Sequence, residues 1–400
     1  MKRQPDDDEV PWPASGPSVA KKPRGALTET HGTGSAIGLQ HALDFTALDS
    51  HSSISERFDL VGSTILHDFE LVVRVDEVET AFEILELEFY LWKDGCHEDP
   101  FTHGNEEQRV SGRWSFHRSP RRSADSHRSA TSATGYRGGS RKGLDLTIGG
   151  PAPPTSSPYF SQGATTNSSD QPSAIGIRGG ALLRSLQRVS DSKQVISGPS
   201  LIVDEILRLS SAPSISSLVE QTWSNNISAF ACSRNGTSLF LRPKATASSV
   251  STPPTVYRSP RIGLDLSHPG TTASPTHPRV VFLARRYRYF THPTFLTANG
   301  RTQTFLGVLR TCLDLDLDAG QALDDDDDQL RAAVKRIMGL GEPTVARYLG
   351  YFRGGRESGK LEAFVGAKGK GASQSPATYL AMMGTLDQYR AETDVRGIVA

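Results

Sequence analysis

The sequence predicts an α+β protein built on a mostly antiparallel, curved sheet with a few helices. Two observations predict this class. Several short segments alternate apolar and polar residues with the period of two that is typical of strands, whereas few segments carry a helical pattern. The Ser, Pro and Gly residues gather in blocks between these segments, as expected for surface loops lengthened by insertion.

The composition narrows the class of protein. The chain has 400 residues, a formal net charge of zero and 3 Cys, at positions without metal-ligand spacing. No apolar run approaches a membrane span, and the first residues lack the apolar core of a signal peptide. We therefore expect an intracellular protein with no membrane partner. The basic cluster Lys21–Arg24 favours the nucleus, with the cytoplasm as the alternative.

The elements follow in order. Residues 1–54 are predicted to be a disordered tail, and the apolar positions from Phe58 to Ile65 fit a helix. A second helix is expected at Ser197–Leu209, capped by Ser197 or Ser200, with Pro199 in its first turn. Strands are expected at Phe69–Val75, Phe82–Trp92, Arg113–Arg118, Lys142–Ile148, Ser238–Arg242, Pro260–Leu266 and Arg279–Phe290. Ile175–Leu186 is expected to be a turn followed by a buried strand.

These elements predict one α+β domain over residues 55–312, interrupted by low-complexity insertions at 119–135, 150–173, 244–256 and 267–278. A run with eight Asp and no Lys or Arg spans Asp314–Asp328, so residues 313–328 are expected to be a solvated acidic linker. Helices at Gln329–Met338, Thr344–Phe352 and Ser375–Arg390 then predict a small helical appendage over 329–392.

The strand Phe82–Trp92 carries the first candidate site. Its odd positions are apolar and face a core, so Glu86, Glu88 and Tyr90 share the other face. Carboxylates solvated on a half-exposed strand are one interpretation. The other is a general base in a shielded position, for which Arg184, a charge within the apolar segment ALLRSL, is the natural partner. A purely structural Arg–Glu pair engages the same residues.

A basic segment carries the second candidate. Nine Lys and Arg lie in the segment from Arg109 to Lys142, interleaved with His117 and Tyr136, and its end forms a Gly-rich turn over Tyr136–Gly143. Such a segment can hold a phosphate backbone and stack on a base, or it can be a solvated loop. His97, His103 and His117 are candidate metal ligands, but their spacing matches no metal motif, so no metal and no cofactor are expected.

Several segments of the chain, taken in sequence order, resemble segments of the alkyladenine (3-methyladenine) DNA glycosylase family. The resemblance rests on RFDLVG at Arg57–Gly62, FEILELEFYL, PFTHGN, ALLRSL, SGPS at Ser197–Ser200, PRIGLDL and the segment Arg285–Phe290. Each motif is short, and their shared order is the stronger argument.

The resemblance implies an enzyme that flips a damaged purine nucleotide out of duplex DNA and cuts its glycosidic bond, without a cofactor. The second Glu of the motif, Glu88, would activate the water that attacks C1′, and Arg184 would organise that water. Tyr90 and His103 would line the base pocket.

The chain departs from the family in its basic segment, where Tyr136 is the one candidate for the aromatic wedge, and in its next strand, where Thr147 or Asp145 replaces the family's Asn. Glu86, His117 and Lys142 complete the candidate substrate-binding set. Two alternatives stay open: a non-catalytic nucleic-acid-binding protein, and a phosphoesterase or nuclease that uses His103, His117 and Lys142.

Overall fold

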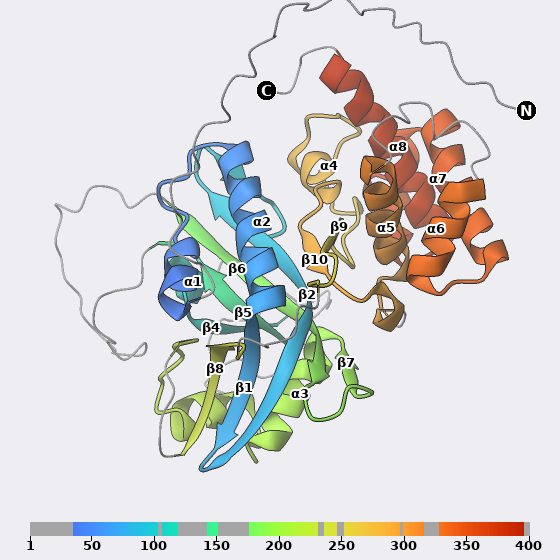
Figure 1. Cartoon of the computed structure of the whole chain (residues 1–400). Helices are drawn as coiled ribbons and strands as arrows, with labels where there is room; N and C mark the ends of the chain where they lie inside the picture. Colours follow the sequence, from blue (N-terminus) through green and yellow to red (C-terminus); the bar gives the residue numbers. More distant parts are fainter. Residues whose placement is uncertain are drawn as a thin grey trace, which may run out of the picture. The chain divides into compact units, whose positions relative to one another are not determined.

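The strands pair antiparallel in every ladder of one sheet, whose main order is β4-β5-β6-β2-β1-β8. The computed structural model describes residues 35–102, 106–118, 142–150, 176–230, 236–245, 252–296, 299–315 and 328–395. The α+β class with a curled antiparallel sheet is therefore confirmed (Figure 1). The strands of the main order are β1 Phe69–Val75, β2 Val78–Lys93, β4 Trp114–Arg118, β5 Lys142–Ile148, β6 Ile177–Arg188 and β8 Thr237–Pro243.

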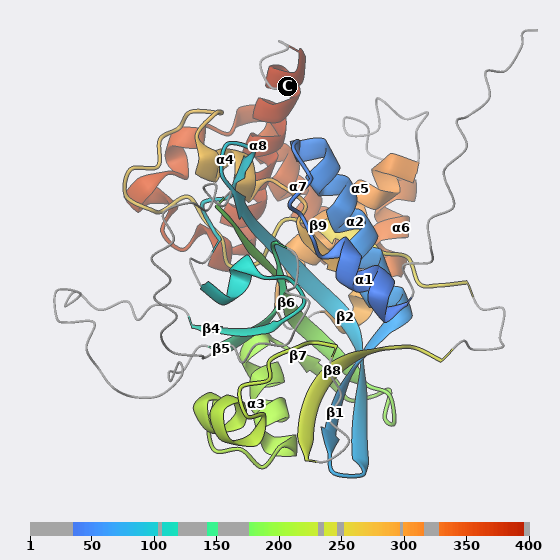
Figure 2. The same ribbon diagram turned by 90° about the vertical axis from the view of Figure 1, so that its left-hand side faces the viewer.

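Four short strands complete the sheet at its sides. β3 His97–Glu98 and β10 Arg288–Phe290 pair with β2, β7 Val195–Ser197 pairs with β6, and β9 Tyr257–Ser259 pairs with β10. Each is shorter than an average strand, whereas β2, which pairs with β1, β3, β6 and β10, is the long central strand of the sheet (Figure 2).

One hydrophobic core lies between the sheet and the first helices, α1 Ala36–Ala42 and α2 His51–Asp68. Phe58 of α2 stacks on Phe89 of β2 with ring centroids 4.5 Å apart. Gly62 lets α2 approach β10 closely, because a Cβ there would lie 2.8 Å from the ring of Tyr289. The amphipathic helix α3 Pro199–Leu209 adds Ile202, Val203 and Ile206 to the same core.

A second core joins β9, β10 and α4 Pro278–Leu283 to four further helices, which lie together in Figure 1. These helices are α5 Arg301–Leu315, α6 Asp328–Met338, α7 Glu342–Ser358 and α8 Pro376–Val395. Gly355 and Gly384 let α7 and α8 touch backbone to backbone, since a Cβ at either position would clash with a carbonyl of the other helix. The predicted helical appendage, 329–392, thus shares its core with residues 257–312.

Several boundaries differ from the predictions. The predicted tail contains α1 and the first turn of α2, because Leu39, Leu43 and Phe45 are fully buried. The expected strand Pro260–Leu266 is an irregular segment, and the expected strand Arg279–Phe290 divides into α4 and β10. Helix α5 was not predicted. Residues 267–277 form an irregular loop in which Thr271 is buried, and Pro278 already begins α4.

The start of α3 also differs from its prediction. Its N-cap residue is Gly198, at φ 131°, and no side chain caps the helix. Pro199 occupies the first turn as expected. Ser200 instead exchanges two 3.1 Å hydrogen bonds with the backbone N–H and carbonyl of Lys142, which ties α3 to β5.

The remaining helical segments are short. Four are 3-10 helices, at Glu106–Arg109, Leu361–Ala363, Gly366–Gly369 and Ala372–Gln374, and a fifth, Pro293–Phe295, precedes α5. A π-helix spans Ser217–Thr222. The predicted insertions 119–135 and 150–173, most of 316–328, and the basic cluster Lys21–Arg24 lie wholly or almost wholly outside the described residues.

Candidate functional site

Both faces of β2 are buried from Ile84 to Phe89, although their chemistry is opposite. Leu87 and Phe89 are 0 % exposed and belong to the first hydrophobic core. Glu86 and Glu88 alternate with them on the other face and are only 2 % and 0 % exposed. The interpretation of solvated carboxylates on a half-exposed strand is therefore wrong. Two carboxylates at this depth need cationic or hydrogen-bonding partners.

A β-bulge in β6 supplies the first partners. The register between β2 and β6 shifts on both sides of Glu86, which leaves Leu85 as an extra residue on β2 and Arg184 as an extra residue on β6. A bulge of this kind can bring two successive side chains toward one partner. Arg184 Nε lies 3.2 Å from Glu86 Oε1, and its Nη1 lies 3.2 Å from Glu88 Oε2. The hydroxyl of Ser185 donates to Glu86 Oε2 at 2.5 Å.

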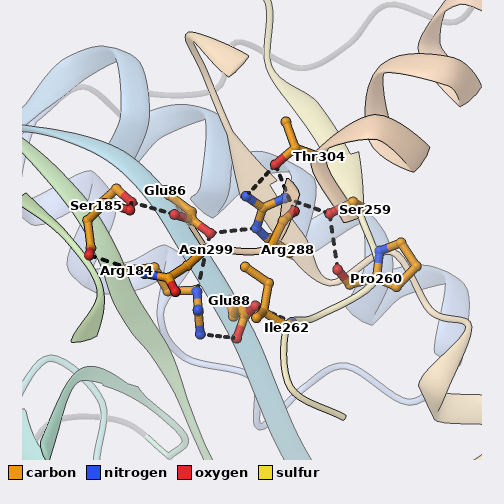
Figure 3. Close-up of polar contacts among 12 residues, drawn as sticks. Glu86, Glu88, Arg184, Ser185, Ser259, Pro260, Ile262, Arg288, Asn299 and Thr304 are labelled. Atoms are coloured by element: carbon orange, nitrogen blue, oxygen red, sulfur yellow. Dashed lines mark hydrogen bonds and ion pairs between the residues drawn. The ribbon is translucent and has the colours of Figure 1, made fainter. Parts of the chain in front are cut away.

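Arg288 of β10 supplies the second cation (Figure 3). Its Nε donates to Glu86 Oε1 at 2.5 Å, while Nη1 and Nη2 donate to Ser259 and Thr304, each at 3.0 Å. One guanidinium thus joins β2, β9 and α5. Burial raises the pKa of Glu86, but the charges of Arg288 and Arg184 outweigh it and bring that pKa below its ordinary value. Glu86 is accordingly an anion held between two arginines.

Glu88 receives three hydrogen bonds. Its Oε2 accepts from the hydroxyl of Tyr90 at 2.9 Å as well as from Arg184, and its Oε1 accepts from the backbone N–H of Ile262 at 2.6 Å. Burial and the charge of Glu88 raise the pKa of Tyr90 well above its ordinary value, so the phenol keeps the proton that it donates. Oε1, with one bond, retains capacity for another donor.

A buried ion pair fixes the segment that contains Ile262. Arg261 binds Asp99 through both terminal nitrogens, at 2.5 Å and 3.1 Å, and both side chains are 0 % exposed. Nη1 of Arg261 also donates to the carbonyl of Phe89, and the guanidinium lies 4.4 Å from the ring centroid of Tyr90. The backbone that donates to Glu88 is therefore anchored to β2 itself.

A polar cavity of about 920 Å³ begins at this segment. Its walls come from the segment after β9, the start of α5, α7 and the residues before α8, and include Ile262, Asn299, Gln303, Tyr348, Lys370 and Gln374. The exposed Lys370 and the N-terminus of α5, with Arg301, bring positive charge to it, whereas Asp265 brings a carboxylate that accepts from Ser267. Ile262 is thus shared between the cavity wall and Glu88.

A second polar group lies on the same face of the sheet. Glu88 and Asp145 are both paired with Leu182 of β6, so their side chains point to one side, two strand spacings or roughly 10 Å apart. His117 Nδ1 lies 2.8 Å from Asp145 Oδ2, which also accepts from Gln108 at 3.2 Å. Gly180 permits this arrangement, because a Cβ there would lie 3.0 Å from Asp145 Cβ.

The predicted site residues thus fall into groups. Glu86, Glu88, Tyr90 and Arg184 lie together, and His117 lies with Asp145. Thr147 has a structural part: its hydroxyl donates to the carbonyl of Val110 and accepts from the N–H of Arg113. Lys142 binds Asp204 of α3 at 2.8 Å. Its register places it on the sheet face opposite His117, so these two predicted phosphate ligands do not converge.

His103 and Tyr136 lie outside the described residues. Among the residues that the structure does describe, no group of three or more His, Cys, Asp or Glu could hold a metal ion, and no helix is long and apolar enough to cross a membrane.

Sequence reasoning did not find Arg288, the Arg261–Asp99 pair or the residues of α5. Arg288 alternates with Tyr287 and Tyr289 in a strand-like segment, and an arginine in that setting is the signal that a buried carboxylate partner exists. Asn299 and Gln303 carry no comparable signal.

Comparison with known proteins gives a limited result. No protein-family model matches the chain. A curated relative, the uncharacterized protein L759 of Acanthamoeba polyphaga mimivirus, is 29% identical over 217 residues, which cover 54% of this chain and 82% of that protein. The chain is therefore similar to a viral protein whose name states no activity.

Proposed function

We propose that the protein hydrolyses the N-glycosidic bond of a nucleotide in nucleic acid, with Glu88 as the general base. The single observation that carries this proposal is the position of Glu88. Its carboxylate is held by Arg184 and Tyr90 on one oxygen and by Ile262 N–H on the other, and Ile262 is also a wall of the 920 Å³ polar cavity. The resemblance to the alkyladenine DNA glycosylase family adds support, since it assigns the same role to Glu88.

The proposed step is a displacement at the sugar. Glu88 takes a proton from water as the water oxygen forms a bond to C1′. The bond from C1′ to the base nitrogen breaks, and its electron pair leaves with the base, which then takes up the proton that Glu88 accepted. Arg184 and Tyr90 fix the carboxylate through Oε2, so Oε1 is the oxygen available to the water.

Access is the demanding part of this proposal, because the side chain of Glu88 is 0 % exposed. Water and substrate reach Oε1 only when the backbone near Ile262 moves away from it. Substrate binding in the cavity would therefore have to displace this segment, as in closing and opening steps of other enzymes.

The test is single-turnover base release from duplexes that carry hypoxanthine, ethenoadenine or 3-methyladenine. Removal of a general base lowers such rates by about 10²–10⁴. We therefore expect wild type to release one of these bases and Glu88→Gln to release it at least about 100-fold more slowly, with DNA binding retained. Glu83→Gln is the matched control, because Glu83 lies on the same strand and its side chain is 41 % exposed.

Burial of the charges also favours a second function, that of a non-catalytic nucleic-acid-binding protein. In that case Glu86 and Glu88 serve to hold Arg184 and Arg288. This function predicts salt-dependent binding without base release from any duplex.

The phosphoesterase alternative receives less support, because Lys142 and His117 occupy opposite faces of the sheet. Strand cleavage in the same assay, in place of base release, would favour it.

A further inference from the structure

A second cavity, of about 350 Å³, lies between α5, α7, α8 and the segments beside β9 and β10. Its charged lining consists of four arginines and two aspartates, so its formal charge is +2. We call it the arginine cavity and define it by Arg286, Arg310, Arg356, Arg390, Asp314 and Asp387. The function proposed above makes no use of these residues.

The two aspartates hold three of the four arginines in place. Asp387 of α8 binds Arg310 of α5 and lies 3.4 Å from Nε of Arg356 of α7. Asp314 lies 3.1 Å from Arg286, and both are partly exposed at the rim, at 39 % for Arg286 and 61 % for Asp314. Arg390 donates to the carbonyl of Ala284 at 3.4 Å. Four guanidinium groups from separate elements thus surround one space.

An arginine cluster of this kind suits phosphate. The guanidinium is always charged, and its planar fork donates two parallel hydrogen bonds to a phosphate group. The apolar residues of the cavity, among them Leu306, Phe352 and Met383, lower the local dielectric and strengthen such contacts. Arg310 is already braced over the ring of Phe352, 5.7 Å from its centroid, so it loses little conformational freedom on binding.

The arginine cavity and the large polar cavity share no lining residue, but three pairs of neighbouring residues place the two cavities near each other. Pro260 lines the first and Ile262 the second. On α5, Leu306 lines the arginine cavity and Gln303, three residues away, lines the large cavity. On α7, Phe352 lines the arginine cavity and Tyr348, four residues away, lines the large cavity. Residues three or four apart on a helix are direct neighbours. A nucleic acid with one nucleotide in the large cavity can therefore place a nearby backbone phosphate in the arginine cavity.

From this geometry we infer that the arginine cavity binds a backbone phosphate of the nucleic acid whose nucleotide enters the large cavity. The inference rests on the nucleic-acid substrate proposed above, but it concerns binding and not the chemical step. Free inorganic phosphate is the other source of the same chemistry.

The test is fluorescence anisotropy of the full chain with a labelled single-stranded oligonucleotide between about 50 and 200 mM salt. Arg286→Gln/Arg390→Gln removes two partly or fully exposed charges of the cavity and leaves the buried pairs intact. Arg208→Gln/Lys193→Gln removes two exposed charges elsewhere and is the matched control. Neither variant alters the Asp-rich sequence after α5, so the effect of these negative charges on oligonucleotide binding is the same in every sample.

We expect the cavity variant to bind at least about tenfold more weakly at 150 mM salt, with a plot of log affinity against log salt that is shallower by about one to two. The control should stay within about twofold of wild type. Equal behaviour of the two variants, or no binding by wild type, would overturn the inference.

A parallel thermal melt with inorganic phosphate at constant ionic strength separates the two sources of the anion. Stabilisation of wild type but not of the cavity variant, without oligonucleotide binding, assigns the cavity to free phosphate and contradicts the nucleic-acid inference. Repeating the anisotropy with Glu88→Gln separates binding from catalysis. If the cavity variant binds the oligonucleotide more weakly but wild type releases no base, the proposed enzyme activity is rejected and the phosphate-binding site is retained.

Discussion

The two faces of β2 are equally buried and are built by opposite means. On one face Ile84, Leu87, Phe89 and Leu91 are at most 1 % exposed and pack as an ordinary core. On the other, Glu86 and Glu88 are at most 2 % exposed and depend on arginines from β6 and β10. Buried ion pairs of this kind often stabilise a protein less than apolar residues of similar volume. The difference suggests that the charged face is kept for function.

The largest expected effect concerns Glu86, which lies between Arg184 and Arg288. Replacing it in Glu86→Leu leaves Arg288, which is 0 % exposed, without its carboxylate partner. We expect the free energy of unfolding to fall by about 3–5 kcal/mol, measured by urea denaturation. In the exposed control Glu83→Leu, on the same strand, it should change by less than about 0.5 kcal/mol. Equal losses in the two variants would show that the buried pairs are not needed for the fold.

A smaller effect on the free energy of unfolding, of about 3 kcal/mol, is expected from the pH dependence of one buried side chain, His97. Burial lowers the pKa of His97 to about 4, against an ordinary value of 6.5. Its Nδ1 lies 2.9 Å from the carbonyl of Leu91 and its Nε2 2.8 Å from the hydroxyl of Tyr287, so both nitrogens are used by the neutral ring.

The sign follows from proton binding. Between pH 6.5 and about 4 the unfolded chain binds a proton at His97 that the folded protein does not, so stability falls as the pH falls through this range. Lowering the pKa from 6.5 to about 4 corresponds to about 3 kcal/mol. In His97→Asn this part of the pH dependence should vanish from the unfolding free energy. Parallel curves for wild type and variant would mean that His97 is not buried as a neutral ring.

The smallest effect concerns the hydroxyl of Tyr90, which donates to Glu88 Oε2 at 2.9 Å. In Tyr90→Phe the ring keeps its contact with the guanidinium of Arg261. The variant should lose only about 1 kcal/mol of unfolding free energy, since one hydrogen bond is lost and Arg184 still binds the same oxygen. If Glu88 is catalytic, base release by Tyr90→Phe should also be measurably slower than base release by wild type, although most of the variant remains folded. A rate equal to that of wild type would exclude Tyr90 from a positioning role.

The same comparison shows how far the sequence could predict the molecule. The strands β1 and β5 were predicted with their observed bounds, because period-two alternation is a local property of the chain. The pairing of Arg184 with Glu86 and Glu88 was also predictable, since a charge in an apolar strand needs a partner.

The covering of the charged face was not predictable, because it depends on contacts between distant parts of the chain. Nothing in the segment around Glu86 specifies that Thr304 and Arg288, more than 200 positions away, will close over it. Helix α5 was missed for a related reason: its buried polar residues Thr302, Gln303 and Thr304 weaken the apolar periodicity on which prediction depends.

One measurement tests the central claim most directly: single-turnover base release and unfolding free energy, determined side by side for Glu86→Gln and Glu88→Gln. The two glutamates lie two residues apart on one strand and share Arg184. If Glu88 is the general base, Glu88→Gln will lose at least about 100-fold in rate while it keeps most of its stability, and Glu86→Gln will lose mainly stability. Base release by Glu88→Gln at the wild-type rate would contradict the account.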